Sequence, residues 1–69
     1  MTDELKMSLL NELMFGLDVC NHEHHEEIMF LHDFGFVKVY DEDLQFTATT
    51  EEGVLELKRL IKLYFVFLN

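Results

Sequence analysis

The sequence has no proline and only one cysteine, Cys20, among its 69 residues. Without proline, repeats or a low-complexity linker, nothing marks a boundary between domains, so we expect one domain over residues 1–69. A single cysteine cannot form a disulfide within the chain, and no four Cys or His residues have the spacing of a zinc ribbon. A chain this short buries only about 60 % of the surface that it exposes when unfolded. These absences favour self-association as a further source of stability.

Basic residues are also scarce. Five Lys and Arg stand against fourteen Asp and Glu, which gives a formal net charge of −9 at pH 7. This charge repels phosphate backbones and anionic lipid headgroups, so we expect no direct binding to nucleic acid or to a membrane. The longest apolar run, residues 63–68, is far shorter than the roughly 20 residues that span a bilayer. The first four residues include the acidic Asp3 and Glu4, whereas a targeting signal needs basic side chains near its start. We therefore expect a cytoplasmic protein.

Apolar residues nevertheless make up 49 % of the chain, and seven Phe and two Tyr provide large side chains to bury, so we expect it to fold. Leucines recur at helical spacing after an acidic first turn, which predicts a helix over residues 3–15 that Gly16 ends. A connector, residues 17–20, leads to Asn21, a suitable N-cap for a second helix over residues 22–33.

The second half of the chain predicts a hairpin and a long helix. Residues 36–40 and 44–48 alternate with period two around an acidic turn, which is typical of a β-hairpin. Thr49 and Glu52 have the form of a capping box, so the last helix should start near Thr50, with Gly53 as a mild weakness. Its expected core stripe is Val54, Leu57, Leu60, Ile61 and Tyr64. The expected fold class is α+β, with two N-terminal helices, a β-hairpin and a C-terminal helix.

The stretch LHDFGFVKV at residues 31–39, the hairpin after it and TTEEGVL at residues 49–55 resemble the second half of winged-helix domains from small bacterial and archaeal regulators. In that family a Gly-hydrophobic-Val/Ile step leads into the wing, and a Thr-x-x-Gly-like cap opens the next helix. The resemblance covers Leu31 to Leu57 and implies a degenerate winged-helix scaffold that pairs through terminal helices. The family's DNA contacts do not carry over, because only two helices precede the wing and both the matching helix and the wing tip are acidic.

A run of histidines and acids opens the second helix: His22-Glu23-His24-His25-Glu26-Glu27. On a helix His22 would share a face with His25 and Glu26, and His25 with His32, so two or three ligands would converge on Zn²⁺ or Ni²⁺. The run is not the His-Glu-x-x-His motif of metalloproteases and nothing completes a structural site, so we predict an acid-rich solvated helix start with no metal. A metal-responsive or pH-responsive module stays open as an alternative, since an unperturbed His titrates at about pH 6.5.

Candidate nucleophiles are few. Ser8 and Cys20 are the obvious ones, and nothing in the sequence places a base and an oxyanion donor near either. There is no glycine-rich phosphate loop, and a domain of this size has little room for a substrate pocket. We therefore expect a protein that is not an enzyme and has no cofactor.

Acidic residues concentrate in three places that the expected fold separates by about 15 to 20 Å, the length of a 12-residue helix. Carboxylates spaced in this way can occupy the groove of a nucleic-acid-binding protein as phosphates do, although ordinary solubility charge is a competing explanation. The sequence thus predicts a small acidic inhibitor or modulator, of the DNA-mimic type that phages and mobile elements direct at a basic, nucleic-acid-handling host protein. The residues assigned to partner binding are Glu23, Glu26, Glu27, Asp41, Glu42, Asp43, Glu51 and Glu52. The alternative is a dimeric, winged-helix-like transcription regulator.

The last helix becomes apolar on all sides near its end. Such a segment either fills the core of its own chain or pairs with the same segment of a second chain in a symmetric dimer. Because the core of one chain is small, we favour a homodimer through the C-terminal helix. The residues assigned to dimerisation are Tyr64, Phe65, Phe67 and Leu68.

Overall fold

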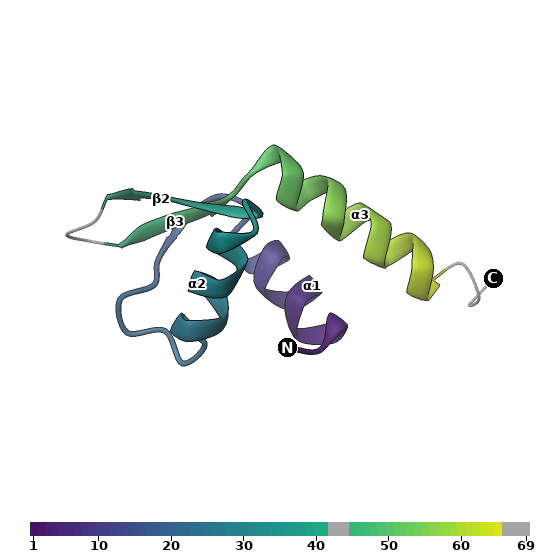
Figure 1. Cartoon of the computed structure of the whole chain (residues 1–69), viewed down its shortest axis with the longest axis horizontal. Helices are drawn as coiled ribbons and strands as arrows, with labels where there is room; N and C mark the ends of the chain where they lie inside the picture. The colour runs from purple at the N-terminus through teal and green to yellow at the C-terminus, as the bar shows by residue number, and fades with distance from the viewer. Residues whose placement is uncertain (42–44, 66–69) are drawn as a thin grey trace.

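The structure, a computed structural model, describes residues 1–41 and 45–65. These form three helices and three strands, which confirms the α+β class with two N-terminal helices, a hairpin and a C-terminal helix (Figure 1). In chain order the elements are α1 (Asp3–Glu12), β1 (Leu17–Asp18), α2 (His25–Asp33), β2 (Val37–Asp41), β3 (Phe46–Thr49) and α3 (Glu51–Phe65). The tip of the expected hairpin, residues 42–44, and the last four residues lie outside the described ranges.

The connector predicted at residues 17–20 contains a strand, β1. It pairs with β3 in antiparallel register, Leu17 opposite Thr47 and Asp18 opposite Phe46, so the sheet has the order β1-β3-β2. Both residues of β1 are exposed, and two residues are too few to show a period of two. The sequence pattern therefore predicts only the two hairpin strands and not β1. The turn into β1 is made at Gly16, whose φ of 90° lies in the left-handed region that favours glycine.

Helix α2 begins at His25, three residues later than predicted, and its N-cap is His24 and not Asn21. The preceding segment forms turns in place of a helical start. His22 donates its backbone N–H to the carbonyl of Val19 at 3.1 Å, and its Nδ1 accepts from the backbone N–H of His24 at 2.9 Å. The imidazole of His22 thus accepts a local hydrogen bond from the backbone of His24, and this contact competes with helix formation in the segment.

The core is formed by leucines of α1 packed between α2, the sheet and α3. Its fully buried side chains are Leu9, Leu10, Leu13, Val19, Ile28, Leu31, Val37 and Leu60, with Leu57 almost fully buried. The stripe predicted for α3 is only partly correct, because Ile61 and Tyr64 are 44 % and 45 % exposed. The reason is visible in Figure 1: the last turns of α3 extend past the other elements, in a molecule 44 Å long.

Two adjacent threonines join β3 to α3 and connect both other helices to that junction. Thr49 donates its backbone N–H to Leu13 O at 2.9 Å and its hydroxyl to Leu10 O at 2.7 Å, at the end of α1. Thr50 donates its backbone N–H to Phe36 O at 2.9 Å, after the end of α2. Its hydroxyl accepts from Gly53 N at 3.1 Å, so Thr50 caps α3 and the capping box predicted at Thr49 was displaced by one residue.

Gly53 allows the first turn of α3 to lie directly against the backbone of Phe36, the residue before β2. A Cβ atom at this position would overlap the carbonyl oxygen of Phe36 and come within 2.6 Å of Thr49 Cγ2. Gly53 is therefore a packing requirement and not the mild weakness that helix propensity predicts.

We predict that Gly53→Ala destabilises the chain by about 1–3 kcal/mol through overpacking, although alanine is the better helix former. Thermal unfolding followed by circular dichroism measures the effect. The control is Ser8→Ala on an exposed position of α1, which should keep or slightly raise the melting temperature. A Gly53→Ala variant as stable as the Ser8→Ala variant would contradict the close packing of α3 on the backbone of Phe36.

Candidate functional site

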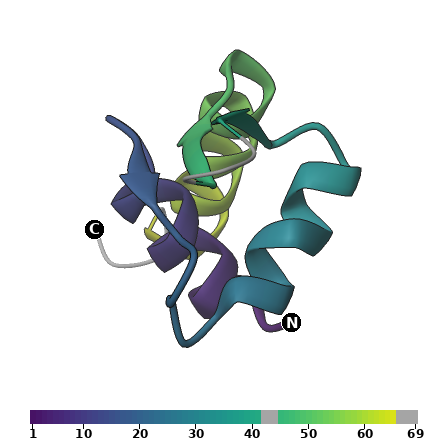
Figure 2. The same cartoon turned by 90° about the vertical axis from the view of Figure 1, so that its left-hand side faces the viewer.

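The acidic residues assigned to partner binding do not gather in one patch. Glu26 and Glu27 lie in the first turn of α2 and Glu23 just before that helix, while Glu51 and Glu52 lie in the first turn of α3. The starts of these helices are on opposite sides of the body in both views (Figures 1 and 2). Asp41 ends β2, and Glu42 and Asp43 lie outside the described residues. The acidic residues at the start of α2 and those in the first turn of α3 thus do not share one face.

The candidate histidine ligands are only partly brought together: His25 and His32 line one hollow with Met29, Val39 and Gln45, whereas His22 does not line it. His22 Nε2 lies 2.5 Å from Glu12 Oε1 on α1, because His22 precedes α2 and turns away from it. His25 Nε2 lies 2.5 Å from Gln45 Oε1, and the exposed His32 has Asp33 as its nearest acid, at 3.9 Å. Among residues 1–41 and 45–65 no three His, Cys, Asp or Glu side chains are placed to hold a metal ion. The helical spacing that would join His22, His25 and Glu26 is lost because the helix starts at His25.

The exposed side of α2 carries a feature that the sequence reading did not assign. Ile28 and Leu31 turn inward, whereas Phe30 and Phe34, four residues apart, are 52 % and 60 % exposed. Their ring centroids are 4.9 Å apart in an edge-to-face pair, and Phe34 stacks on Phe36 with centroids 6.1 Å apart and planes 13° from parallel. The exposed rings of Phe30 and Phe34 thus form one aromatic cluster with the half-buried ring of Phe36. The spacing of Glu26, Phe30 and Phe34 at every fourth position was the available signal.

This cluster borders two surface hollows. The first, of 240 Å³, is mostly apolar and is lined by Lys6, Phe30, Leu31, Phe34, Phe36 and Glu56. The second, of 230 Å³, is lined by Met1, Glu26, Glu27 and Phe30. Because Phe30 lines both, aromatic rings and carboxylates adjoin along one helix. We call the surface made by Glu26, Glu27, Phe30, Phe34 and Phe36 the α2 face.

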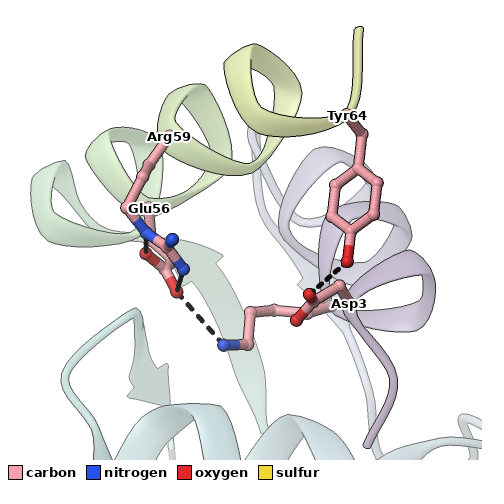
Figure 3. A network of polar contacts seen from close by, with 5 residues as sticks. Asp3, Glu56, Arg59 and Tyr64 are labelled. Carbon is pink, nitrogen blue, oxygen red and sulfur yellow. Dashed lines mark hydrogen bonds and ion pairs between the residues drawn. The ribbon is translucent and has the colours of Figure 1, made fainter. Parts of the chain in front are cut away.

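A group of ion pairs forms the far wall of the first hollow, where α1 meets α3 (Figure 3). Lys6 Nζ lies 3.1 Å from Glu56 Oε2, and Arg59 donates from Nε to Glu56 Oε1 at 2.7 Å and from Nη2 to Oε2 at 3.1 Å. The Arg59 hydrogen bonds are the largest influence on the Glu56 carboxyl, and with Lys6 they lower its pKa from 4.5 to about 2. Lys6 Nζ also lies 5.7 Å from the centre of the Phe36 ring.

The residues assigned to dimerisation divide between two surroundings. Tyr64 donates its hydroxyl to Asp3 Oδ2 at 2.5 Å, which ties the end of α3 to the start of α1 (Figure 3). That hydrogen bond raises the pKa of Tyr64. Phe65 is 51 % exposed, and Phe67 and Leu68 lie outside the described residues. Tyr64 thus contacts its own chain, whereas Phe65 is available to another.

The chain matches no family model, no curated protein and no solved structure. The resemblance of residues 31–57 to winged-helix domains therefore stays a sequence-based prediction. Within the described residues, no helix is both long and apolar enough to cross a membrane.

The Glu56 ion pairs predict a specific pH dependence. A carboxyl whose pKa is lower in the folded chain stabilises it above the unfolded pKa of 4.5, and this contribution is lost as the pH falls towards about 2. We expect Glu56→Gln to be less stable than the natural chain by about 1 kcal/mol at pH 7, and the difference to vanish near pH 2.

Urea unfolding at a series of pH values measures this difference. The matched control is Glu52→Gln, which removes the same charge from an exposed position of the same helix. An equal effect of both substitutions at every pH would show that net charge, and not the contacts of Glu56, sets the stability.

Proposed function

We propose that the chain is a non-enzymatic, cytoplasmic binding protein that inhibits or modulates a basic, nucleic-acid-handling host protein, and that the α2 face is its main contact. The observation that carries this proposal is the exposed aromatic cluster beside the carboxylates of Glu26 and Glu27. It adds an apolar anchor to the acidic surface that the sequence predicts.

Exposed aromatic side chains supply the affinity in this proposal. Burying a phenylalanine that is otherwise exposed contributes about 1.5–3 kcal/mol, and residues that dominate binding energy lie in the centres of interfaces, with polar residues around them. Phe30 and Phe34 are more than half exposed, and the hollow beside them is large enough for an apolar side chain of a partner. The ring of Phe34, stacked on Phe36, is already ordered, so less conformational entropy is lost on binding.

Charge supplies the selectivity. Glu26 and Glu27 lie one turn before Phe30 on α2, and the whole chain carries −9, so a partner with Lys or Arg near an apolar anchor is attracted and oriented. An Arg side chain suits this face particularly well, because it can pair with a carboxylate and stack on an aromatic ring. Proteins that handle nucleic acids present such basic surfaces. The combination of carboxylates with aromatic rings therefore favours a basic, nucleic-acid-handling partner.

The winged-helix alternative would require contact with DNA. The α2 face offers carboxylates and phenyl rings, and carboxylates repel phosphate. Basic side chains are exposed elsewhere, at Lys58, Arg59 and Lys62 of α3, so a direct test of duplex binding remains necessary.

We expect the natural chain, immobilised and exposed to a lysate of its source cells, to retain basic proteins that Phe30→Ser/Phe34→Ser does not retain. The control is Phe15→Ser, which removes an equally apolar side chain that is 95 % exposed and outside the α2 face. Random duplex DNA added as competitor should reduce retention, because the partner's basic surface is then occupied. The purified chain itself should not bind the same duplex at low salt.

Three outcomes would contradict the proposal. Retention that survives both phenylalanine substitutions would remove the α2 face from the contact. Retention that is unaffected by duplex competitor and by moderate salt would remove the nucleic-acid-handling partner. Duplex binding by the purified chain would favour the transcription regulator.

A further inference from the structure

Helix α3 has an apolar flank that its own chain leaves largely uncovered. Val54, Ile61 and Phe65 recur at intervals of seven and four residues, so they lie along one side of the helix. Val54 is half-buried, whereas Ile61 and Phe65 are 44 % and 51 % exposed. We call these three residues the α3 flank. It faces away from Glu56, the residue through which α3 binds Lys6 of α1.

Helix α3 differs from the rest of the chain in its net charge and in the arrangement of its charged residues along the sequence. Its first turns hold Glu51, Glu52 and Glu56, and its later turns hold Lys58, Arg59 and Lys62. These cancel, so α3 is formally neutral and the entire net charge of −9 lies in the rest of the chain. A second copy of the chain is therefore least repelled along α3.

We propose that two copies of the chain pair through their α3 flanks with the helices antiparallel. In that orientation the acidic start of each helix lies beside the basic end of the other, and the helix dipoles also oppose each other favourably. A parallel pair would place Lys62 beside Lys62 and Glu51 beside Glu51. The segregated charge thus makes α3 complementary to itself in one orientation only.

One ion pair follows from the helical geometry. Residues 51 and 62 are eleven positions apart, about three turns, so Glu51 and Lys62 lie on nearly the same line beside the α3 flank. When two antiparallel α3 helices overlap over this span, Glu51 of one copy meets Lys62 of the other. A two-fold axis makes this pair occur twice.

Pairing in this way is independent of the proposed function and compatible with it. The hollow of the α2 face is bordered by Glu56, on the other side of α3 from the α3 flank. A dimer therefore leaves both α2 faces open to partners. It also revises the sequence-based assignment: Phe65 belongs to the contact, while Tyr64 is bound to Asp3 of its own chain.

Sedimentation equilibrium of the full chain over a range of concentrations tests the dimer. The natural chain should associate reversibly as a dimer, and Ile61→Glu should weaken association by at least about tenfold, since it introduces a charge into a buried apolar contact. The matched control is Leu63→Glu, which makes the same change at a 49 % exposed position on the other side of α3 and should leave association unchanged. Circular dichroism confirms that both variants are folded.

The orientation is tested by exchanging charges. Glu51→Lys and Lys62→Glu should each weaken association by about fivefold, given the modest strength of exposed ion pairs, and the double variant should restore it. A natural chain that stays monomeric at millimolar concentration would overturn the proposal. An equal effect of Ile61→Glu and Leu63→Glu would overturn the assigned surface, and a double variant no tighter than the single ones would overturn the antiparallel arrangement.

Discussion

The junction at Thr49 and Thr50 is the constraint on which the rest of this structure depends. The backbone N–H and the hydroxyl of Thr49 donate hydrogen bonds to carbonyls at the end of α1. The backbone N–H of Thr50 donates to Phe36 O after α2, and its hydroxyl caps α3. Carbonyls at a helix C-terminus have no partner within the helix, so using them as acceptors costs no secondary structure. The α2 face depends on this junction, because Thr50 binds the backbone of Phe36 and caps α3, and the hollow is lined by both Phe36 and Glu56 of α3.

A chain with so small a core also needs contacts at its edges, and α3 supplies them through charged and polar groups. Glu56 joins Lys6 to Arg59, and Tyr64 binds Asp3, so these polar contacts add to the burial of Leu57 and Leu60 in holding α3 to its own chain. Each such contact contributes little at a protein surface. Together they fix the side of α3 that faces its own chain, and this leaves the α3 flank outside.

The sequence predicts the order and type of the main elements because they follow from strong periodic patterns. Leu9, Leu10 and Leu13 are buried as helical spacing requires, and the alternation after Gly35 predicts the hairpin. The start of α2 was placed three residues early, because six consecutive polar residues look like a helix start while the side chain of His22 binds locally. Strand β1 could not be predicted from a local pattern, because it is defined by its pairing with β3, a segment far away in the sequence.

The candidate site was less predictable than the fold for a related reason. Spacing along α2 indicates that Glu26, Phe30 and Phe34 share a side, but it does not tell whether that side is covered. Only the placement of α1 and α3 leaves Phe30 and Phe34 exposed and adds Phe36 from the segment after α2. Conversely, Ile61 fits a core-facing stripe by its spacing and is exposed because α3 extends past the helices that would cover it.

Two apolar surfaces on one small protein raise the question of what prevents indiscriminate association, and the distribution of charge answers it. At the α2 face the rings lie beside Glu26 and Glu27, so two copies that met there would bring like charges together in a contact of low dielectric. At the α3 flank the neighbouring charges cancel, because the first turns of the helix are acidic and the later turns are basic. Under the two proposals, the same apolar chemistry is directed to a basic partner at the α2 face and to a second copy of the chain at the α3 flank.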